Sequence, residues 1–189
     1  HPDIVLLDLG MPHLDGVRLG ALLGDILAVP VDIVNDGRAA AIAEARWGAG
    51  AGNSDVFTLA LGTGIAGCHV VNGSVAAGAH GIAGELGHIV VEPDGELCGC
   101  GQRGCLETVI GAPALRRRWH AAGGEGSPRD LLVAYESGDA RALPIVDRAG
   151  RALGDALLTL LALVDPGCVV IGGGLASAPH RLVQLAVAH

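Results

Sequence analysis

The spacing of apolar residues along the chain predicts strands and helices in alternation. Apolar positions recur at helical spacing in five segments, at 16–28, 37–48, 115–122, 130–137 and 143–164. The last of these is the longest, with apolar residues at positions 146, 149, 153, 157, 160, 161 and 164. Short apolar runs typical of buried strands lie at 4–9, 31–34, 56–61, 67–71 and 168–171. Alternation of this kind indicates an α/β fold.

Glycine, proline and asparagine mark where these elements end. Asn72-Gly73 is a strong signal for a tight hairpin turn after the strand at 67–71. Gly62-Thr63-Gly64 is expected to join two paired strands, and Asp165-Pro166 is expected to stop the longest helix. A further glycine run, Gly172-Gly173-Gly174, ends the last strand.

Composition narrows the class of protein. At 189 residues the chain is expected to be a single domain, 1–189, with an aliphatic core because only 2% of its residues are aromatic. The net charge is −8 and every one of the 12 basic residues is arginine, which argues against a nucleic-acid surface. Arg116-Arg117-Arg118 is the one basic run, and we expect it to be a solvated helix face.

The expected compartment follows from the absence of a long apolar run and from the spacing of the cysteines. No apolar run reaches the length of a membrane span, and the chain does not open with a signal peptide. Cysteines spaced for a metal rather than for disulfides are typical of a reducing compartment. We therefore expect a cytoplasmic protein with no membrane partner.

The densest chemistry lies between residues 84 and 107. Three thiols, Cys98, Cys100 and Cys105, follow His88, and three thiolates with one imidazole form the closed tetrahedral set of a structural zinc site. A disulfide knot is the alternative, but a Cys-x-Cys pair bridges poorly and three cysteines leave one unpaired. Glu85 and Glu107 flank the cluster, which suggests a site for a molecule rich in hydroxyls.

The same residues carry a family resemblance. His88-x9-Cys98-x-Cys100-x4-Cys105, preceded by Gly84-Glu85-x-Gly87-His88, resembles the signature of the ROK family of repressors and sugar kinases. The resemblance runs from about Pro30 to Gly174. It implies the larger lobe of a two-lobe protein with the actin-like ATPase, ribonuclease H-like α/β fold. It also implies transfer of the γ-phosphoryl group of ATP, accompanied by magnesium, to a hexose such as glucose, and a homodimer.

Asn35 and Asp36 sit between a predicted strand and a helix, where such residues commonly cap the helix N-terminus. The resemblance implies a second role: Asp36 would be the general base that takes a proton from the sugar hydroxyl. Asn35, Asp36, Glu85, His88 and Glu107 would bind the sugar. Family kinases read Glu-Asn-Asp-Ala-Asn here, whereas this chain has Val34-Asn35-Asp36-Gly37-Arg38.

A glycine-rich segment is the candidate phosphate site. Gly62-Thr63-Gly64-Ile65-Ala66-Gly67 fits the dinucleotide pattern G-x-G-x-x-G, but a predicted strand follows it, whereas that pattern needs a helix. It instead resembles the second phosphate loop of actin-like sugar kinases, with Thr63 as the phosphate-binding residue. By the same resemblance Gly172, Gly173 and Gly174 would contact the nucleotide; the alternative is a plain strand–helix turn.

The ends of the chain depart from the family pattern. Residues 2–16 resemble the phosphoacceptor loop of a receiver domain around Asp8, but the chain has no lysine to complete that site. The segment 1–29 is a candidate remnant of the junction with a missing N-terminal lobe. The Asp-x-Gly-Gly-Thr hairpin that opens family kinases is absent, and the C-terminal helix is expected to be cut short at His189. We expect the isolated chain to bind sugar and zinc but to turn over poorly.

Two other functions stay open. The first is the effector domain of a sugar-responsive ROK repressor, which would bind nucleic acid only through a helix-turn-helix ahead of His1. The second is a zinc-binding module without a ligand. The hexose, and the choice between ATP and polyphosphate as donor, are not specified by the sequence.

Overall fold

A computed structural model describes residues 16–31, 33–177 and 181–189. Its sheet is built from β1 (Asp55–Leu61), β2 (Ile65–Val71), β3 (Ser74–Val75) and β4 (Cys168–Gly172). The helices before the long central one are α1 (Gly16–Leu27), α2 (Asp36–Trp47), the 3-10 turn η1 (Leu86–His88), α3 (Leu106–Ile110), α4 (Ala112–Ala121) and α5 (Pro128–Glu136). The chain then forms α6 (Leu143–Val164), α7 (Gly174–Ser177) and α8 (Arg181–Ala188).

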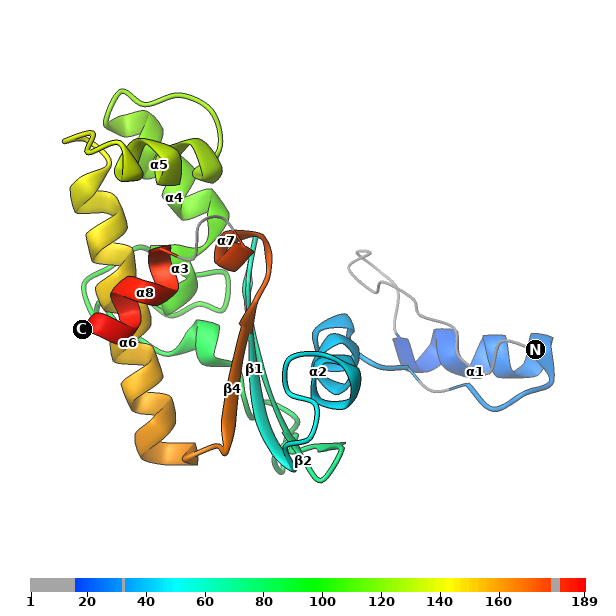
Figure 1. Cartoon of the computed structure of the whole chain (residues 1–189). Coiled ribbons are helices and arrows are strands. Elements are labelled where there is room, and N and C mark those ends of the chain that lie inside the picture. Colours follow the sequence, from blue (N-terminus) through cyan, green and yellow to red (C-terminus); the bar gives the residue numbers. More distant parts are fainter. Residues whose placement is uncertain (1–15, 32, 178–180) are drawn as a thin grey trace.

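The sheet separates α2 from the other helices of the body. In Figure 1, α2 lies on one face of the sheet and α6 with α8 on the other, while α1 extends away from the body. The strand order is β3-β2-β1-β4, with β1 antiparallel to β2 and parallel to β4. Asn72 and Gly73 both have positive φ, 51° and 77°, as a type I′ hairpin turn requires, so the predicted turn is confirmed.

The helix α6 supplies a large part of the hydrophobic core. Its residues Val146, Ala149, Leu153 and Leu160 are buried at helical spacing. Gly150 lets α8 approach, because a Cβ there would lie 2.6 Å from Cβ of Leu185. The helix runs over the predicted bounds 143–164.

One predicted strand is wrong. Of the segment 31–34, the described residues Val31, Ile33 and Val34 form no strand and instead link α1 to α2. An apolar run becomes a strand only where another strand can take its backbone hydrogen bonds, and none of the described strands lies beside it. The predicted strand 4–9, with Asp8, lies outside the described residues.

The basic run on α4 also differs from the prediction. Arg116 and Arg117 are exposed, but the side chain of Arg118 is only 15% exposed and donates to two backbone carbonyls. The helix face that carries Arg118 packs against α3, so the arginine is covered. Cys168 is half-buried rather than buried, whereas Cys68 is buried as expected.

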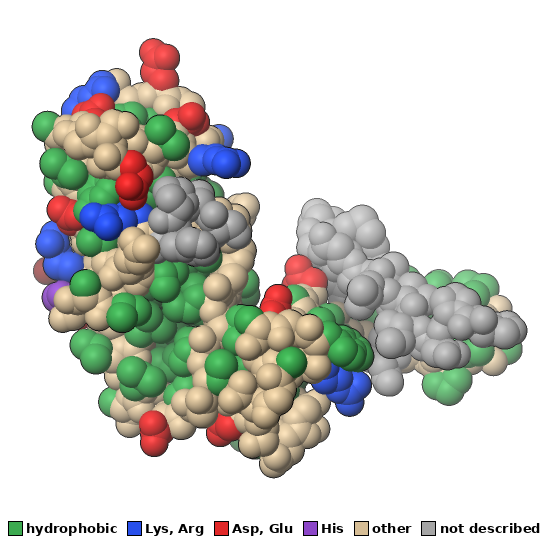
Figure 2. All heavy atoms as spheres, viewed as in Figure 1, with side chains coloured by type: hydrophobic (Ala, Val, Ile, Leu, Met, Phe, Trp, Pro, Cys, Tyr) green, Lys and Arg blue, Asp and Glu red, His purple; other side chains and the backbone are tan. Residues whose placement is uncertain are grey.

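The outer face of the helical layer is partly apolar. Figure 2 shows hydrophobic side chains gathered over the side of the body where α6 and α8 lie. On α6, Leu158, Leu161 and Leu163 are exposed. Within the described part of the chain, no helix is both long enough and apolar enough to cross a membrane.

Candidate functional site

A cavity of about 360 Å³ lies where α2, the β1–β2 hairpin, η1 and α3 meet. Four of the predicted polar residues line it: Asp36 from the start of α2, Glu85 and His88 from η1 and its flank, and Glu107 from α3. The other lining residues are Ala60, Leu61, Gly62, Gly64, Ile65, Ala66 and Gly173. Side chains that are far apart in the sequence therefore converge on one site.

The start of α2 holds Asp36 at this cavity. Asn35 is the N-cap: its side-chain oxygen accepts a hydrogen bond from the amide of Arg38 at 3.2 Å. Oδ1 of Asp36 accepts from the amide of Gly37 at 2.7 Å. Asp36 lines the cavity and Asn35 does not, so of this pair only Asp36 is brought together with Glu85, His88 and Glu107.

Glu107 is fixed by the hairpin opposite. Its Oε2 accepts a hydrogen bond from the backbone amide of Ile65 at 2.9 Å. Gly64 is needed for this approach, because a Cβ at that position would lie 2.9 Å from the same carboxylate oxygen. The Glu107 carboxylate, which follows the cysteine cluster, is thus bonded directly to the residue after Gly62-Thr63-Gly64, here called the glycine loop.

The predicted metal ligands form one cluster. One ligand atom from each of His88, Cys98, Cys100 and Cys105 lies within 4.8 Å of all the others. Nδ1 of His88 is 3.6 Å from Sγ of Cys98, and Sγ of Cys100 is 3.6 Å from Sγ of Cys105. Tetrahedral zinc, with Zn–S near 2.3 Å, separates two sulfurs by about 3.8 Å and sulfur from nitrogen by about 3.5 Å. The four residues therefore fit a zinc ion, and the three cysteines are free of disulfides.

The loop between the cysteines is folded by its own backbone. The amide of Cys98 donates to the carbonyl of Gln102 at 2.7 Å, and Gly101 turns the chain with φ 93°. A hydrogen bond from the Gln102 backbone lowers the pKa of Cys100 to about 7, while burial raises the pKa of Cys105 to about 12. A buried thiol such as Cys105 becomes a thiolate only beside a positive charge, which a metal ion supplies.

A second cavity of about 400 Å³ adjoins the glycine loop on its other side. It brings together the predicted Thr63 and Gly174 with a segment that the sequence did not indicate, Ser127 to Arg129. Ala112, Leu175 and Gly62 complete its wall. The capping box of α5, Ser127 with Asp130, could be read from the sequence, but not that this turn folds back onto the glycines.

The second glycine run divides between the two cavities. Gly173 lines the first and Gly174 the second, while Gly172 belongs to β4 and lines neither. Gly173 has φ 93°, and a Cβ there would lie 2.4 Å from the carbonyl oxygen of Leu61. Only glycine fits where β4 passes the end of β1, so this turn has a structural requirement of its own.

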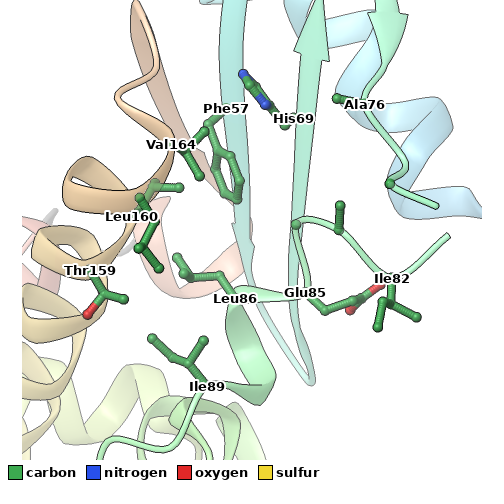
Figure 3. A pocket seen from close by; sticks show the side chains of 14 residues that line it. Phe57, His69, Ala76, Ile82, Glu85, Leu86, Ile89, Thr159, Leu160 and Val164 are labelled. Atoms are coloured by element: carbon green, nitrogen blue, oxygen red, sulfur yellow. The ribbon is translucent and has the colours of Figure 1, made fainter. Parts of the chain in front are cut away.

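A third cavity, of about 500 Å³, was not predicted. Phe57, Leu86 and Ile89 face Leu160 and Val164 of α6 across it, as Figure 3 shows. The remaining lining residues are His69, Ala76, Gly78, Ile82, Ala83, Gly84, Glu85, Thr159 and Leu163. Glu85 lines both this apolar space and the first cavity, so the two adjoin.

Known proteins resemble the chain over most of its length. The glucokinase of Thermotoga maritima is 40% identical over an alignment of 167 residues, and the match covers 80% of this chain and 53% of the relative. The structure of a ROK hexokinase from Thermus thermophilus matches with TM-score 0.84 and 36% identity, covering 93% of this chain and 64% of that one. A ROK glucokinase from Streptomyces griseus, solved with glucose and AMPPNP, matches with TM-score 0.75 and 31% identity, covering 90% and 60%.

A regulator is also similar. The structure of a ROK-family transcriptional regulator, a homologue of the E. coli MLC protein, matches with TM-score 0.79 and 32% identity, over 95% of this chain and 49% of that one. The chain spans about half the length of the curated glucokinase that it matches. These likenesses confirm the actin-like ATPase fold. The ROK family model matches residues 11–188, nearly the whole chain, and together with the convergence of the signature residues this shows that the chain belongs to the ROK family.

Proposed function

We propose that residues 1–189 form the sugar- and zinc-binding lobe of a kinase that phosphorylates a hexose, with ATP as donor and glucose as the first candidate. One observation carries the proposal: Asp36, Glu85, His88 and Glu107 line one cavity beside the glycine loop. The similarity to glucokinases, one of them solved with glucose and AMPPNP, supports it. Because the chain covers about half of such a relative, the activity is proposed for the full-length protein.

The side chains around the cavity suit a sugar. Hexose hydroxyls both donate and accept, the carboxylates of Glu85 and Glu107 accept, and an imidazole nitrogen of His88 does either. The hydrogen bond from Ile65 holds Glu107 in one orientation, so that little side-chain freedom would be lost on binding. Asn35 would assist from the end of α2, next to Asp36, although it does not line the cavity.

Asp36 would act as the general base. As the bond between the hexose oxygen and the γ-phosphorus forms, the hydroxyl proton passes to the Asp36 carboxylate. The bond from that phosphorus to the β–γ bridging oxygen breaks, and ADP leaves. Asp36 is exposed at the mouth of the cavity, within reach of a ligand that enters it.

The zinc ion would be structural, because four protein ligands leave no open position. Nδ1 of His88 faces the thiols, which leaves Nε2 for a sugar hydroxyl. Glu107 follows the ligand Cys105 by two residues. The segment 89–105, here called the metal loop, would therefore position both His88 and Glu107 for the sugar.

The nucleotide would lie against the glycine turns. Thr63, with the backbone amides around Gly62 and Gly64, would bind phosphate, and Gly172, Gly173 and Gly174 would border the nucleotide, whose phosphates bring magnesium. The adjoining cavity lined by Thr63 and Gly174 supports this assignment.

The second candidate is the effector domain of a sugar-responsive repressor. The similarity to a ROK transcriptional regulator favours it, and the sugar and zinc sites would be shared. A helix-turn-helix ahead of this lobe, and sugar-dependent binding to DNA, would distinguish it from the kinase.

The deciding experiment measures the full-length protein with a panel of hexoses. Calorimetry gives the affinity for each sugar, a coupled assay gives ADP release with ATP and magnesium, and light scattering tests the proposed homodimer. Phosphorylation of at least one hexose is the expected result. Normal sugar binding without phosphorylation of any hexose would exclude the kinase and favour the repressor, and the absence of sugar binding would exclude both.

A further inference from the structure

Arg118 connects two segments that flank the first cavity. Its Nη1 donates to the carbonyl of Val109 at 2.8 Å, and its Nη2 donates to the carbonyl of Thr108 at 3.0 Å. Nη2 also donates to Oε1 of Glu96 at 2.8 Å. One planar guanidinium therefore joins the end of α3 to the loop that carries the cysteines.

The two carbonyls belong to the last turn of α3. The last carbonyls of a helix lack partners within it, and α3 has only five residues. The carbonyl of Glu107 is satisfied by the amide of Gly111, but Thr108 and Val109 are buried and take their hydrogen bonds from Arg118. Water has little access here, so removal of the guanidinium would leave both groups unsatisfied.

The third contact reaches the metal loop. Glu96 lies two residues before the ligand Cys98, and its carbonyl accepts from the amide of Gly104, one residue before Cys105. Its carboxylate bonds to both Arg117 and Arg118. Arg118 thus contacts the polypeptide on each side of Cys105 and Glu107.

We propose that Arg118 is a positioning residue for the sugar site, holding α3 so that Glu107 faces the cavity. The inference rests on the proposed function and assigns the role to a residue that touches neither sugar nor metal. Glu107 is anchored at its tip by the amide of Ile65 and at its helix by Arg118. A shift of α3 would break the alignment of these two anchors and weaken sugar binding.

The test compares four variants of the full-length protein. Arg118→Ala removes all three contacts, Arg118→Lys keeps the charge without the fork, and Glu96→Gln removes only the charge of the loop partner. Arg116→Ala is the matched control, because Arg116 lies on the same helix, is exposed and makes no hydrogen bond or ion pair with the described part of the chain. For each variant we would measure the glucose Kd, KM, kcat, zinc content and Tm.

Arg118→Ala should weaken glucose binding by on the order of tenfold and raise KM equally, as losses of supporting hydrogen bonds around a site do. Zinc content should stay at one per chain and kcat at saturating glucose should change by less than about twofold, since Asp36 is untouched. Arg118→Lys should recover part of the affinity, and Glu96→Gln and Arg116→Ala should bind like wild type. This split between KM and kcat is what a purely structural role would not produce.

Other outcomes overturn the inference. If Arg118→Ala only lowers Tm and its folded fraction binds glucose like wild type, Arg118 is structural. If zinc is lost together with affinity, the effect acts through the metal and not through α3. Should Arg118→Ala fail to fold, an affinity of Arg118→Lys equal to wild type would refute the role. A wild type that binds no hexose removes the proposed function itself, which is a different result.

Discussion

The Glu107 carboxylate and the Ile65 amide are 2.9 Å apart and form a hydrogen bond across the cavity wall. Ile65 is the first residue of β2, directly after the Gly62-Thr63-Gly64 loop, and Glu107 is in the first turn of α3, directly after the metal loop. A hydrogen bond between a charged group and the backbone therefore links the candidate sugar site to the candidate phosphate loop. Such bonds are stronger than neutral ones.

Replacing Glu107 separates its two roles. Glu107→Gln keeps an oxygen that can accept from Ile65, so the fold should be retained with a small change in Tm. The charge offered to the sugar hydroxyls is lost, and we expect glucose affinity to fall by about 10- to 100-fold, the worth of a hydrogen bond to a charged group. Calorimetry on the folded variant checks this. Unchanged affinity would show that Glu107 serves the hairpin alone.

The metal site gives the second prediction. We expect one zinc per chain, with Zn–S distances of about 2.3 Å by X-ray absorption. Cys105→Ser should lose zinc, unfold the loop and weaken sugar binding, because His88 and Glu107 lose their positions. Cys68→Ser is the control, since Cys68 lies outside the cluster. A protein without zinc by elemental analysis, or with Cys98 and Cys105 joined by a disulfide, would contradict this.

The long helix and the metal cluster could be predicted because their signals are local. The apolar period of 143–164 matches α6, and the spacing of the three cysteines after His88 is enough to indicate a closed tetrahedral site. That Asp36 and Glu85 line the same cavity was predicted from the family resemblance and not from the spacing of apolar residues. Local patterns thus predicted the helix and the cluster of His88 with three cysteines, and the family resemblance predicted which other residues lie together.

The predictions fail where contacts between residues far apart in the sequence determine the local structure. The run 31–34 is apolar enough for a strand, but the described residues have no strand beside them to complete their hydrogen bonds. The five residues of α3 are too few for a helical period, so the helix that carries Glu107 was not predicted. Arg117 and Arg118 belong to the same basic run, and the packing of α4 against α3 makes Arg118 covered and Arg117 exposed.

The ion pair between Glu92 and Arg148 predicts a dependence of stability on pH. Arg148 donates to both carboxylate oxygens of Glu92, which ties the metal loop to α6, and this hydrogen bonding lowers the pKa of Glu92 below its usual 4.5. A lowered folded-state pKa adds stability above the unfolded-state value, and that stability is lost as the pH falls through the folded-state pKa.

Glu92→Gln should therefore reduce the free energy of unfolding near neutral pH by less than about 1 kcal/mol, since the pair is partly exposed. Urea titrations should show the difference from wild type vanishing at acidic pH, where Glu92 is protonated in both states. Asp94→Asn is the control, an exposed acid in the same loop without a hydrogen bond or ion pair to the described residues. A difference that persists in acid would assign the effect to packing.

The core prediction compares two leucines of α6. Leu153 is fully buried, whereas Leu163 is 81% exposed. Leu153→Ala should lower the free energy of unfolding by about 2–5 kcal/mol through lost burial and the cavity left behind. Leu163→Ala should change it by less than about 0.5 kcal/mol. Equal losses in denaturant titrations would mean that Leu163 is covered in solution.

The catalytic prediction concerns Asp36 in the full-length protein. Asp36→Asn keeps the size of the side chain and can still accept from the amide of Gly37, so the start of α2 should be retained. An amide cannot take the proton of the attacking hydroxyl. We therefore expect glucose affinity to change little while kcat falls by about two to four orders of magnitude, the usual contribution of a general base. Gly37→Ala tests whether a change at the helix start alone has this effect, because a Cβ at Gly37 would lie 3.1 Å from the side-chain oxygen of the N-cap Asn35. Near-normal turnover by Asp36→Asn would leave the kinase standing and reduce Asp36 to a residue of the helix start.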